Sequence, residues 1–106
     1  MRIVFASDAL RDECNNQDLL VKRLGADRAR LVRQRLDELF NAEVLADMRA
    51  MPHVSFLDDA PQGALAIDVG NPYRIVFQPA RPAEADGGWD WRKVDSIRIL
   101  ALTRSR

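Results

Sequence analysis

Four arginines in the C-terminal half of the chain have the type and spacing to form an anion-binding site: Arg74, Arg98, Arg104 and Arg106. A guanidinium group presents planar, paired donors that suit phosphate or carboxylate groups. Arg98 and Arg104 are six residues apart, so an undistorted strand would place both on the same face. If Arg74 joins them, the set predicts a site for RNA phosphate or for an acidic peptide. The alternative is a set of exposed strand cations that discourage edge-to-edge aggregation.

Other side chains capable of chemistry are few. His53 is the single histidine, the residue type that exchanges protons near neutral pH, although a half-exposed structural histidine is the alternative. Cys14 is predicted to be a small apolar residue on a helix face. Trp89 and Trp91 could stack on bases, or they could hold a loop against the domain. The sequence has no glycine-rich phosphate loop and no metal-ligand spacing, so we expect no cofactor and no metal.

The element that must position Arg74 is a β-hairpin over residues 64–79. Apolar residues alternate with small or polar ones on both sides of a turn: Leu65, Ile67 and Val69 before it, and Tyr73, Ile75 and Phe77 after it. The segment Gly70-Asn71-Pro72 marks the turn, and Pro79 closes the second strand because it lacks an N–H group. The alternation predicts that Tyr73 and Arg74 point to opposite faces.

The remaining elements follow from periodicity and capping signals. In chain order we expect a strand over 2–6, a helix over 9–14, a helical region from 17 to about 51 that is interrupted at 25–27, a strand over 53–57, the hairpin, and a last strand over 94–102. The interruption predicts either two helices packed as a pair or one kinked helix. In the last strand, Ile97, Ile99 and Ala101 are expected to share one face. This order predicts an α+β fold with helices on one face of a mostly antiparallel sheet.

Length, charge and composition limit the number of domains and the kinds of partner that this chain can have. The chain has 106 residues, which suggests a single domain over 1–106. Its 16 basic and 16 acidic residues give zero net charge, which argues against strong non-specific nucleic-acid binding but leaves room for a local basic patch. No apolar run is long enough to span a membrane. The single cysteine fits a reducing cytoplasm, which is the location we expect.

Three segments, in this order, resemble a known family. They are Leu24-Gly25 followed by Arg33-Gln-Arg-Leu-Asp-Glu-Leu39, the hairpin Asp68-Val-Gly-Asn-Pro-Tyr-Arg-Ile-Val-Phe-Gln-Pro79, and Asp86-Gly-Gly-Trp-Asp-Trp-Arg-Lys-Val94. They resemble the "LG…QRLDEL", "D…PYRLIFEP" and "DGG-DW-KI" segments of the RelE/ParE superfamily of bacterial type II toxins, within its HigB-like, plasmid-maintenance killer branch. Together they cover most of the chain.

The resemblance implies a helix pair on a curved, RelE-like sheet in the order β-α-α-β-β-β-β. It also implies a cognate antitoxin, expected to be a helix-turn-helix protein, a possible toxin–antitoxin hetero-oligomer, and ribosome-dependent cleavage of mRNA that arrests translation. Arg74 matches the hairpin arginine of the family and Arg104 matches its tail cation, so both are expected to be catalytic, with His53 as the candidate for proton transfer. The expected RNA-binding residues are Lys93, Arg98 and Arg106.

This chain also departs from the branch, and the departures keep other functions open. The family histidine corresponds in register to Ser55 and not to His53, and acidic residues at Asp58 and Asp59 replace basic ones. The alternatives are a catalytically attenuated protein that chiefly binds its antitoxin, a ParE-like inhibitor of another target such as gyrase, and an unrelated α+β interaction module.

Overall fold

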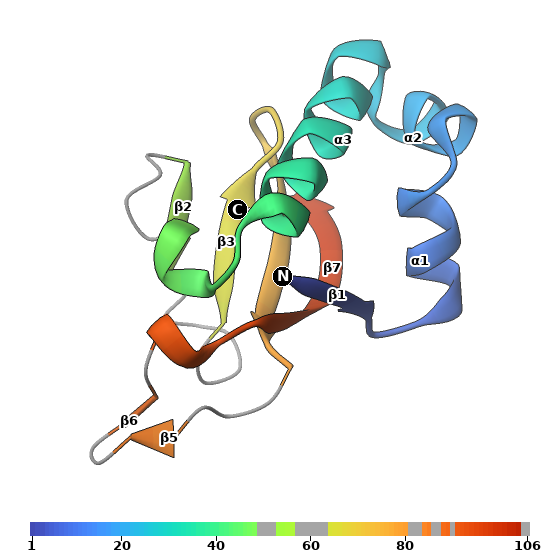
Figure 1. The fold of residues 1–106 in the computed structure, drawn as a ribbon. Coiled ribbons are helices and arrows are strands. Elements are labelled where there is room, and N and C mark those ends of the chain that lie inside the picture. The colour runs from blue at the N-terminus through green and yellow to red at the C-terminus, as the bar shows by residue number, and fades with distance from the viewer. Residues whose placement is uncertain (49–52, 57–63, 81–83, 86–87, 90, 105–106) are drawn as a thin grey trace.

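The computed structural model describes residues 1–48, 53–56, 64–80, 84–85, 88–89 and 91–104. In chain order the elements are β1 (Arg2–Phe5), α1 (Asp8–Cys14), α2 (Gln17–Leu24), α3 (Ala26–Asn41), the 3-10 helix η1 (Leu45–Met48), β2 (Val54–Phe56), β3 (Leu65–Asp68), β4 (Tyr73–Pro79), β5 (Glu84–Ala85), β6 (Gly88–Trp89), the 3-10 helix η2 (Trp91–Lys93) and β7 (Ser96–Arg104) (Figure 1). The helical region expected from 17 to about 51 is thus divided into α2, α3 and η1.

Polar side chains and one glycine determine where the helices begin and end. The Ser7 hydroxyl accepts the Leu10 N–H group at 3.1 Å, and the Asn16 side chain accepts the Leu19 N–H group at 3.2 Å, so α1 and α2 each have an N-cap. Gly25 ends α2 and precedes α3, and its φ of +90° suits glycine. The interruption therefore separates two helices and does not kink a single one.

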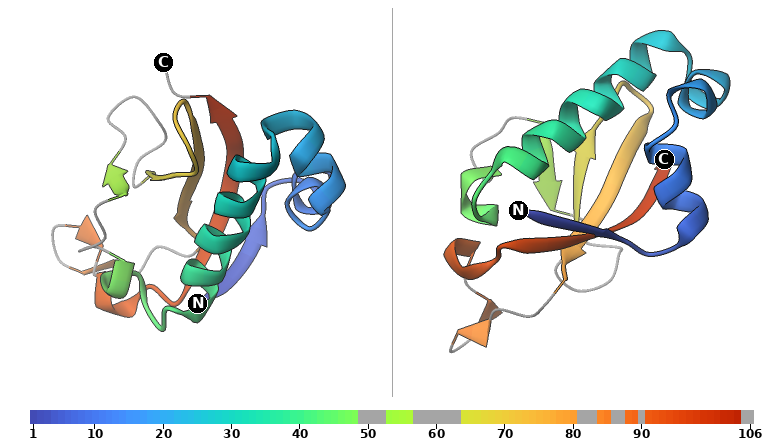
Figure 2. Two further views of the ribbon diagram at one scale, coloured as in Figure 1. Left: turned by 90° about the horizontal axis from the view of Figure 1, so that it is seen from above. Right: turned by 45° about the vertical axis from the view of Figure 1, so that its right-hand side comes forward.

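Five strands form one open sheet in the order β1-β7-β4-β3-β2. β1 pairs with β7 in parallel, and the other three pairings are antiparallel. The predicted α+β fold, with helices packed on a mostly antiparallel sheet, is confirmed. Figure 2 shows α3 lying along one face of the sheet, with α1 and α2 beside it. The sheet is twisted and curved, and its first and last strands in the sequence are spatial neighbours.

A β-bulge interrupts the pairing of β4 with β7. Val76 lies opposite Ala101, but the next residue, Phe77, lies opposite Ile99, so Leu100 has no partner on β4. One extra residue on a strand shifts the alternation of faces beyond it. Ile99 and Ala101 consequently lie on opposite faces although they are two residues apart. The prediction that Ala101 shares a face with Ile97 and Ile99 is wrong for this reason.

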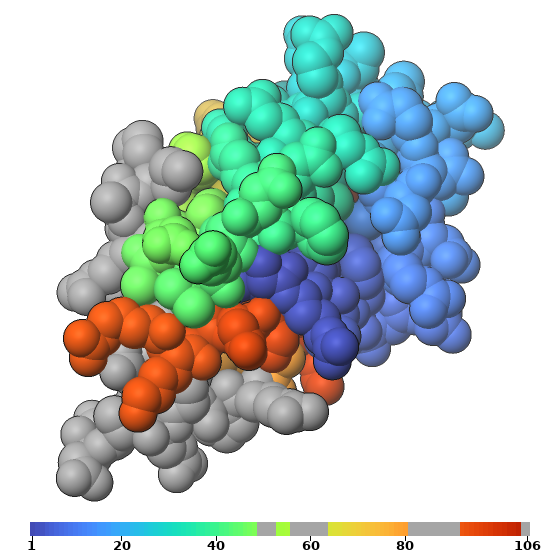
Figure 3. Space-filling view, viewed as in Figure 1, coloured from blue at the N-terminus to red at the C-terminus, as the bar shows by residue number. Residues whose placement is uncertain are grey.

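One hydrophobic cluster fills the space between the helices and the sheet. Its buried members are Met1, Cys14, Leu20, Leu24, Ala29, Val32, Leu36, Leu39, Leu45, Met48, Leu65, Ile67, Val69, Ile75, Phe77, Val94, Ile97, Ile99 and Leu102. The α-amino group of Met1 donates to the Phe40 carbonyl at 2.8 Å, which places the start of β1 against the end of α3 (Figure 3). Within the described residues, no helix is long and apolar enough to cross a membrane.

Candidate functional site

Arg74 lies on the face of the sheet opposite to the helices, which we call the outer face. Its neighbour Tyr73 packs against the hydrophobic cluster, and Phe77 is buried within it. Arg74 alternates with these residues along β4, so its side chain leaves the other face. The predicted separation of Tyr73 and Arg74 is confirmed. The residues directly across from Arg74 are Asp68 on β3 and Thr103 on β7.

The guanidinium group of Arg74 has an unused donor. Its Nε atom is buried and has no hydrogen-bond partner among the described residues. A buried donor without an acceptor costs about 1–3 kcal/mol. An anion that pairs with the positive charge of this guanidinium group would offset that cost.

Arg104 does not join Arg74. Arg104 lies directly opposite Tyr73, so its side chain leaves the helix-covered face, whereas Arg98 lies opposite Gln78 and shares the outer face with Arg74. The bulge in β7 falls between Arg98 and Arg104 and reverses the alternation. The prediction that both arginines share one face is therefore wrong, and only Arg98 lies on the same face as Arg74.

Tyr73 lies between two cations on the helix-covered side. The guanidinium carbon of Arg28 is 5.2 Å from the centre of the Tyr73 ring, and that of Arg104 is 5.9 Å from it. Both distances allow cation–π attraction. Arg28 also donates to the carbonyl groups of Asn71 and Leu24, at 3.0 and 3.2 Å. These contacts hold the hairpin turn against α3 and account for the position of Arg104.

His53 is engaged by the helix layer and not by Arg74. Its Nε2 atom is 3.1 Å from a carboxylate oxygen of Glu38 on α3. The other Glu38 oxygen accepts from Arg35 at 3.1 Å, and Arg35 also donates to the Asp68 carbonyl at 3.0 Å. The structure thus places His53 in a polar cluster between α3 and the sheet. A catalytic role for His53 stays a prediction, and its Nε2 does not meet Arg74 in this arrangement.

The other predicted site residues are only partly described. Lys93 lies in η2 and is exposed. Arg106 lies outside the described residues, as do Asp58 and Asp59. Ser55, in the register of the family histidine, is exposed on β2 and lies opposite Ala66.

A groove of about 500 Å³ lies at the other end of the outer face. It is lined by Arg2, Val4, Ala80, Asp95, Ser96 and Arg98. The parallel pairing places Arg2 opposite Ser96 and Val4 opposite Arg98, so side chains from the first and last strands share the groove. Arg2 was not predicted as a site residue, because nothing in the local sequence signals that β1 and β7 are neighbours.

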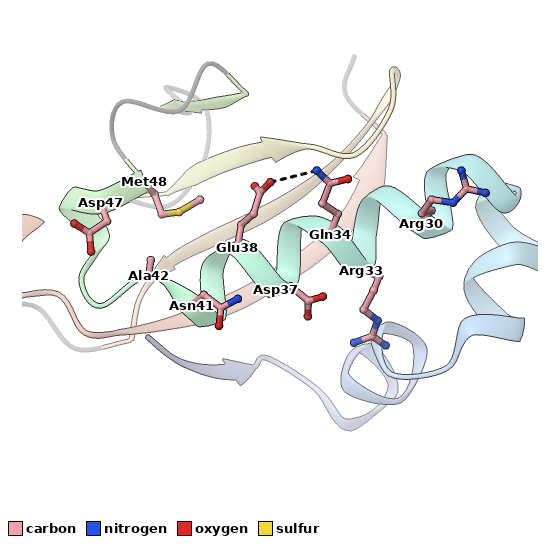
Figure 4. A pocket seen from close by; sticks show the side chains of 9 residues that line it. All are labelled: Arg30, Arg33, Gln34, Asp37, Glu38, Asn41, Ala42, Asp47 and Met48. Carbon is pink, nitrogen blue, oxygen red and sulfur yellow. Dashed lines mark hydrogen bonds between the residues drawn. The ribbon is translucent and has the colours of Figure 1, made fainter.

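A second groove, of about 590 Å³, runs along α3 and faces solvent (Figure 4). Its described charged residues are two cations, Arg30 and Arg33, and three carboxylates, Asp37, Glu38 and Asp47. The mixture gives this groove no excess of positive charge. It is therefore a poorer receptor for a polyanion than the outer face.

Cys14 is buried in the hydrophobic cluster, as predicted for a small apolar helix residue. Burial raises the pKa of its thiol to about 11, and the neighbouring carboxylate of Glu13 adds to the rise. Because the thiolate is the nucleophilic form, Cys14 is unsuited to nucleophilic chemistry.

The overall structure resembles solved toxins. A chain of the YoeB-YefM complex from Staphylococcus aureus matches with a TM-score of 0.58 and 9% sequence identity, over 100% of this chain and 98% of the other. The YoeB/ParE toxin from Agrobacterium tumefaciens matches with a TM-score of 0.55 and 9% identity, over the whole of both chains. No family model matches the sequence, and no curated protein matches it. At this identity the likeness concerns the fold.

Proposed function

We propose that this chain is the toxin of a type II toxin–antitoxin system and that it cleaves mRNA on the ribosome. The observation that carries the proposal is Arg74, a cation on the outer face whose buried Nε has no hydrogen-bond partner among the described residues, in a sheet with the fold of the YoeB and YoeB/ParE toxins. The hairpin around Arg74 also resembles that of the HigB-like branch. We place the chain in this branch on that sequence resemblance alone.

In the proposed reaction, the ribose 2′-hydroxyl attacks the adjacent phosphate and the 5′-oxygen leaves. The negative charge that develops on the phosphorane needs a cation, and two protons must be moved. Arg74 is proposed to bind the scissile phosphate and to stabilise that charge. Asp68 and Thr103 lie directly across from Arg74, so they are the described residues best placed to contact the reacting nucleotide. Arg104 and His53 remain proposed contributors and would have to move toward the outer face.

A second function is favoured by the placement of those two residues. Arg104 lies beside Tyr73 and His53 lies beside Glu38, so Arg74 alone among the three predicted catalytic residues occupies the outer face. Within the described part of the chain, this leaves a site with one cation and no paired acid and base, which fits a toxin that cleaves RNA poorly. Such a protein would act chiefly by binding its antitoxin, or on another target such as gyrase.

The proposed partner is a cognate antitoxin. One structural neighbour was solved as a YoeB-YefM complex, which supports a partner chain for this fold. We propose that the antitoxin places carboxylates over the outer-face arginines, because charge complementarity would both attract it and block access of RNA. The ribosome and mRNA are further proposed partners, because the proposed reaction is cleavage of mRNA on the ribosome. The cytoplasm is the proposed location.

Expression of the chain in bacteria from a tightly repressed promoter tests the function. We expect growth arrest, with primer extension on a reporter mRNA showing cuts at a fixed codon phase. Arg74→Gln should remove both effects. Arg11→Gln is the matched control, since Arg11 is an exposed arginine on α1 whose ion pairs are weak.

The outcomes separate the candidates. Arrest with DNA damage and intact mRNA would favour a ParE-like target, and no arrest would favour an attenuated toxin. Full arrest by a folded Arg74→Gln variant would remove Arg74 from the site.

A further inference from the structure

The groove between Arg2 and Arg98 is not used by the chemistry at Arg74. It lies on the same face of the sheet, yet at the other end of β4. Arg98 is directly opposite Gln78, four residues along the strand from Arg74. At about 3.3 Å per residue and about 4.8 Å between strands, the Cα atoms of Arg74 and Arg98 are roughly 14 Å apart.

We propose that this groove is a second backbone-binding site for single-stranded RNA, in which Arg2 and Arg98 bind a phosphate a few nucleotides away from the phosphate at Arg74. This inference rests on the proposed function and adds a binding residue, Arg2, and a path along the outer face. Two guanidinium groups from neighbouring strands line one concavity, an arrangement that suits an anion with several oxygens.

The charges of the groove support an external anion. Arg2 and Arg98 are both exposed, and neither has an ion pair within the part of the chain that the structure describes. Among the described lining residues Asp95 is the one carboxylate, so this described lining carries one positive charge in excess. The Ser96 hydroxyl is a further donor. Arg2 is anchored through its backbone, since its N–H group donates to the Asp95 carbonyl at 2.9 Å, so its side chain can be changed without breaking the sheet.

The lining favours a nucleic-acid backbone over an acidic protein segment. Of the lining residues that the structure describes, Val4 and Ala80 are apolar, and none is a large apolar or aromatic residue. Protein partners derive most of their binding energy from large anchors in pockets, whereas a phosphate backbone is held by cations and polar donors. The spacing to Arg74 along one face then extends the contact over several nucleotides.

Fluorescence anisotropy with a labelled RNA tests the inference. The probe is an oligouridine of about ten nucleotides with 2′-O-methyl groups, which prevent cleavage, titrated with the full chain between about 20 and 150 mM KCl. A plot of log K, the association constant, against log [KCl] has a negative slope. Arg2→Gln and Arg98→Gln should each make this slope less negative by about 0.7, and the double variant by about 1.4. Affinity at the lowest salt should fall several-fold. Arg30→Gln, an exposed arginine in the α3 groove, should change neither quantity.

The results distinguish this inference from the proposed function. If Arg74→Gln makes the slope less negative but the Arg2 and Arg98 variants match Arg30→Gln, the second site is refuted while the function stands. The second site is also refuted if these variants weaken binding of a decaglutamate peptide but not of the RNA, since the groove would then serve an acidic protein. If the unaltered chain does not bind the RNA, the inference fails, and the cleavage assay in cells decides the function separately.

Discussion

At the scale of single residues, Arg74 has a buried donor that does not contribute to the stability of the fold. Arg28 and Arg35 have their donors satisfied by backbone carbonyls and by Glu38. Arg74 keeps a buried Nε without an acceptor among the described residues. A protein gains nothing in folding free energy from such an atom, because the lost hydration is not replaced. The cost is understandable if the donor is reserved for an anion that binds later.

This difference predicts the effect of Arg74→Met. Methionine fills a similar volume with a flexible apolar chain and removes the unpartnered donor. We expect the free energy of unfolding to stay unchanged or to rise by up to about 1 kcal/mol, while growth arrest is lost. Urea denaturation measures the first effect. A loss of stability well above 1 kcal/mol would show that the guanidinium group contributes to the fold.

Cys14 predicts a pH dependence of stability. Its pKa is raised from 9.0 to about 11 in the folded protein by burial, so the folded state favours the protonated thiol. The unfolded chain loses this proton near pH 9, and stability must therefore fall between pH 9 and pH 11. The loss from this group is roughly 2–3 kcal/mol.

Cys14→Ala removes this loss, whatever constant penalty the smaller side chain brings. Urea denaturation of both proteins at several pH values between 8 and 11 should show a steeper decline for the unaltered chain. Parallel declines would mean that the thiol is not held in an apolar environment.

At the scale of elements, α3 fixes the hairpin that carries Arg74. Arg35 donates to the Asp68 carbonyl at the end of β3, and Arg28 donates to the Asn71 carbonyl in the turn. Gly70 lets the turn approach the helix closely. Its φ is +104°, and a Cβ atom there would lie 2.8 Å from the Cγ atom of Arg28. The position of Arg74 therefore depends on a glycine that is four residues away.

Gly25 and Gly70 have similar positive φ angles, so comparing their alanine variants isolates the effect of the close approach. Gly25→Ala should cost about 1–2 kcal/mol of unfolding free energy, because its φ is +90° while its Cβ would meet open space. Gly70→Ala should cost more, about 2–3 kcal/mol, because it also displaces Arg28. Chemical denaturation compares them. A smaller cost for Gly70→Ala than for Gly25→Ala would show that the helix does not restrain the turn.

At the scale of the whole molecule, one hydrophobic cluster joins segments from Met1 to Leu102. β7 lies between β1 and β4 and pairs with both. The first strand thus depends on the last one, and the described residues of the two layers share one core. The described structure is therefore expected to unfold as one cooperative unit.

Two probes in different layers test this cooperativity. Pulsed thiol labelling follows Cys14 on α1, and far-ultraviolet circular dichroism follows the helices and sheet together. We expect both transitions to have the same midpoint in urea, since exposing the thiol requires opening the common cluster. Labelling that becomes complete at lower urea would reveal that α1 separates before the sheet unfolds.

The sequence by itself determined most of the local structure. Alternation defined the hairpin and the opposite directions of Tyr73 and Arg74, and local signals located the interruption of the helical region at residues 25–27. These features depend on neighbours within a few residues, so local sequence patterns are enough to predict them. Arg74 as an outer-face cation belongs to the same class, because alternation along one uninterrupted strand suffices to place it.

Only the tertiary structure decided which cations share a site. The extra residue at Leu100 reversed the faces beyond it, which separated Arg104 from Arg98. The parallel pairing of the first and last strands places Arg2 near Arg98. The contact of His53 with Glu38 on α3 holds His53 away from Arg74. Each outcome depends on contacts between residues far apart in the chain, and the energy of such contacts is set by the packing of the whole sheet and not by local preference.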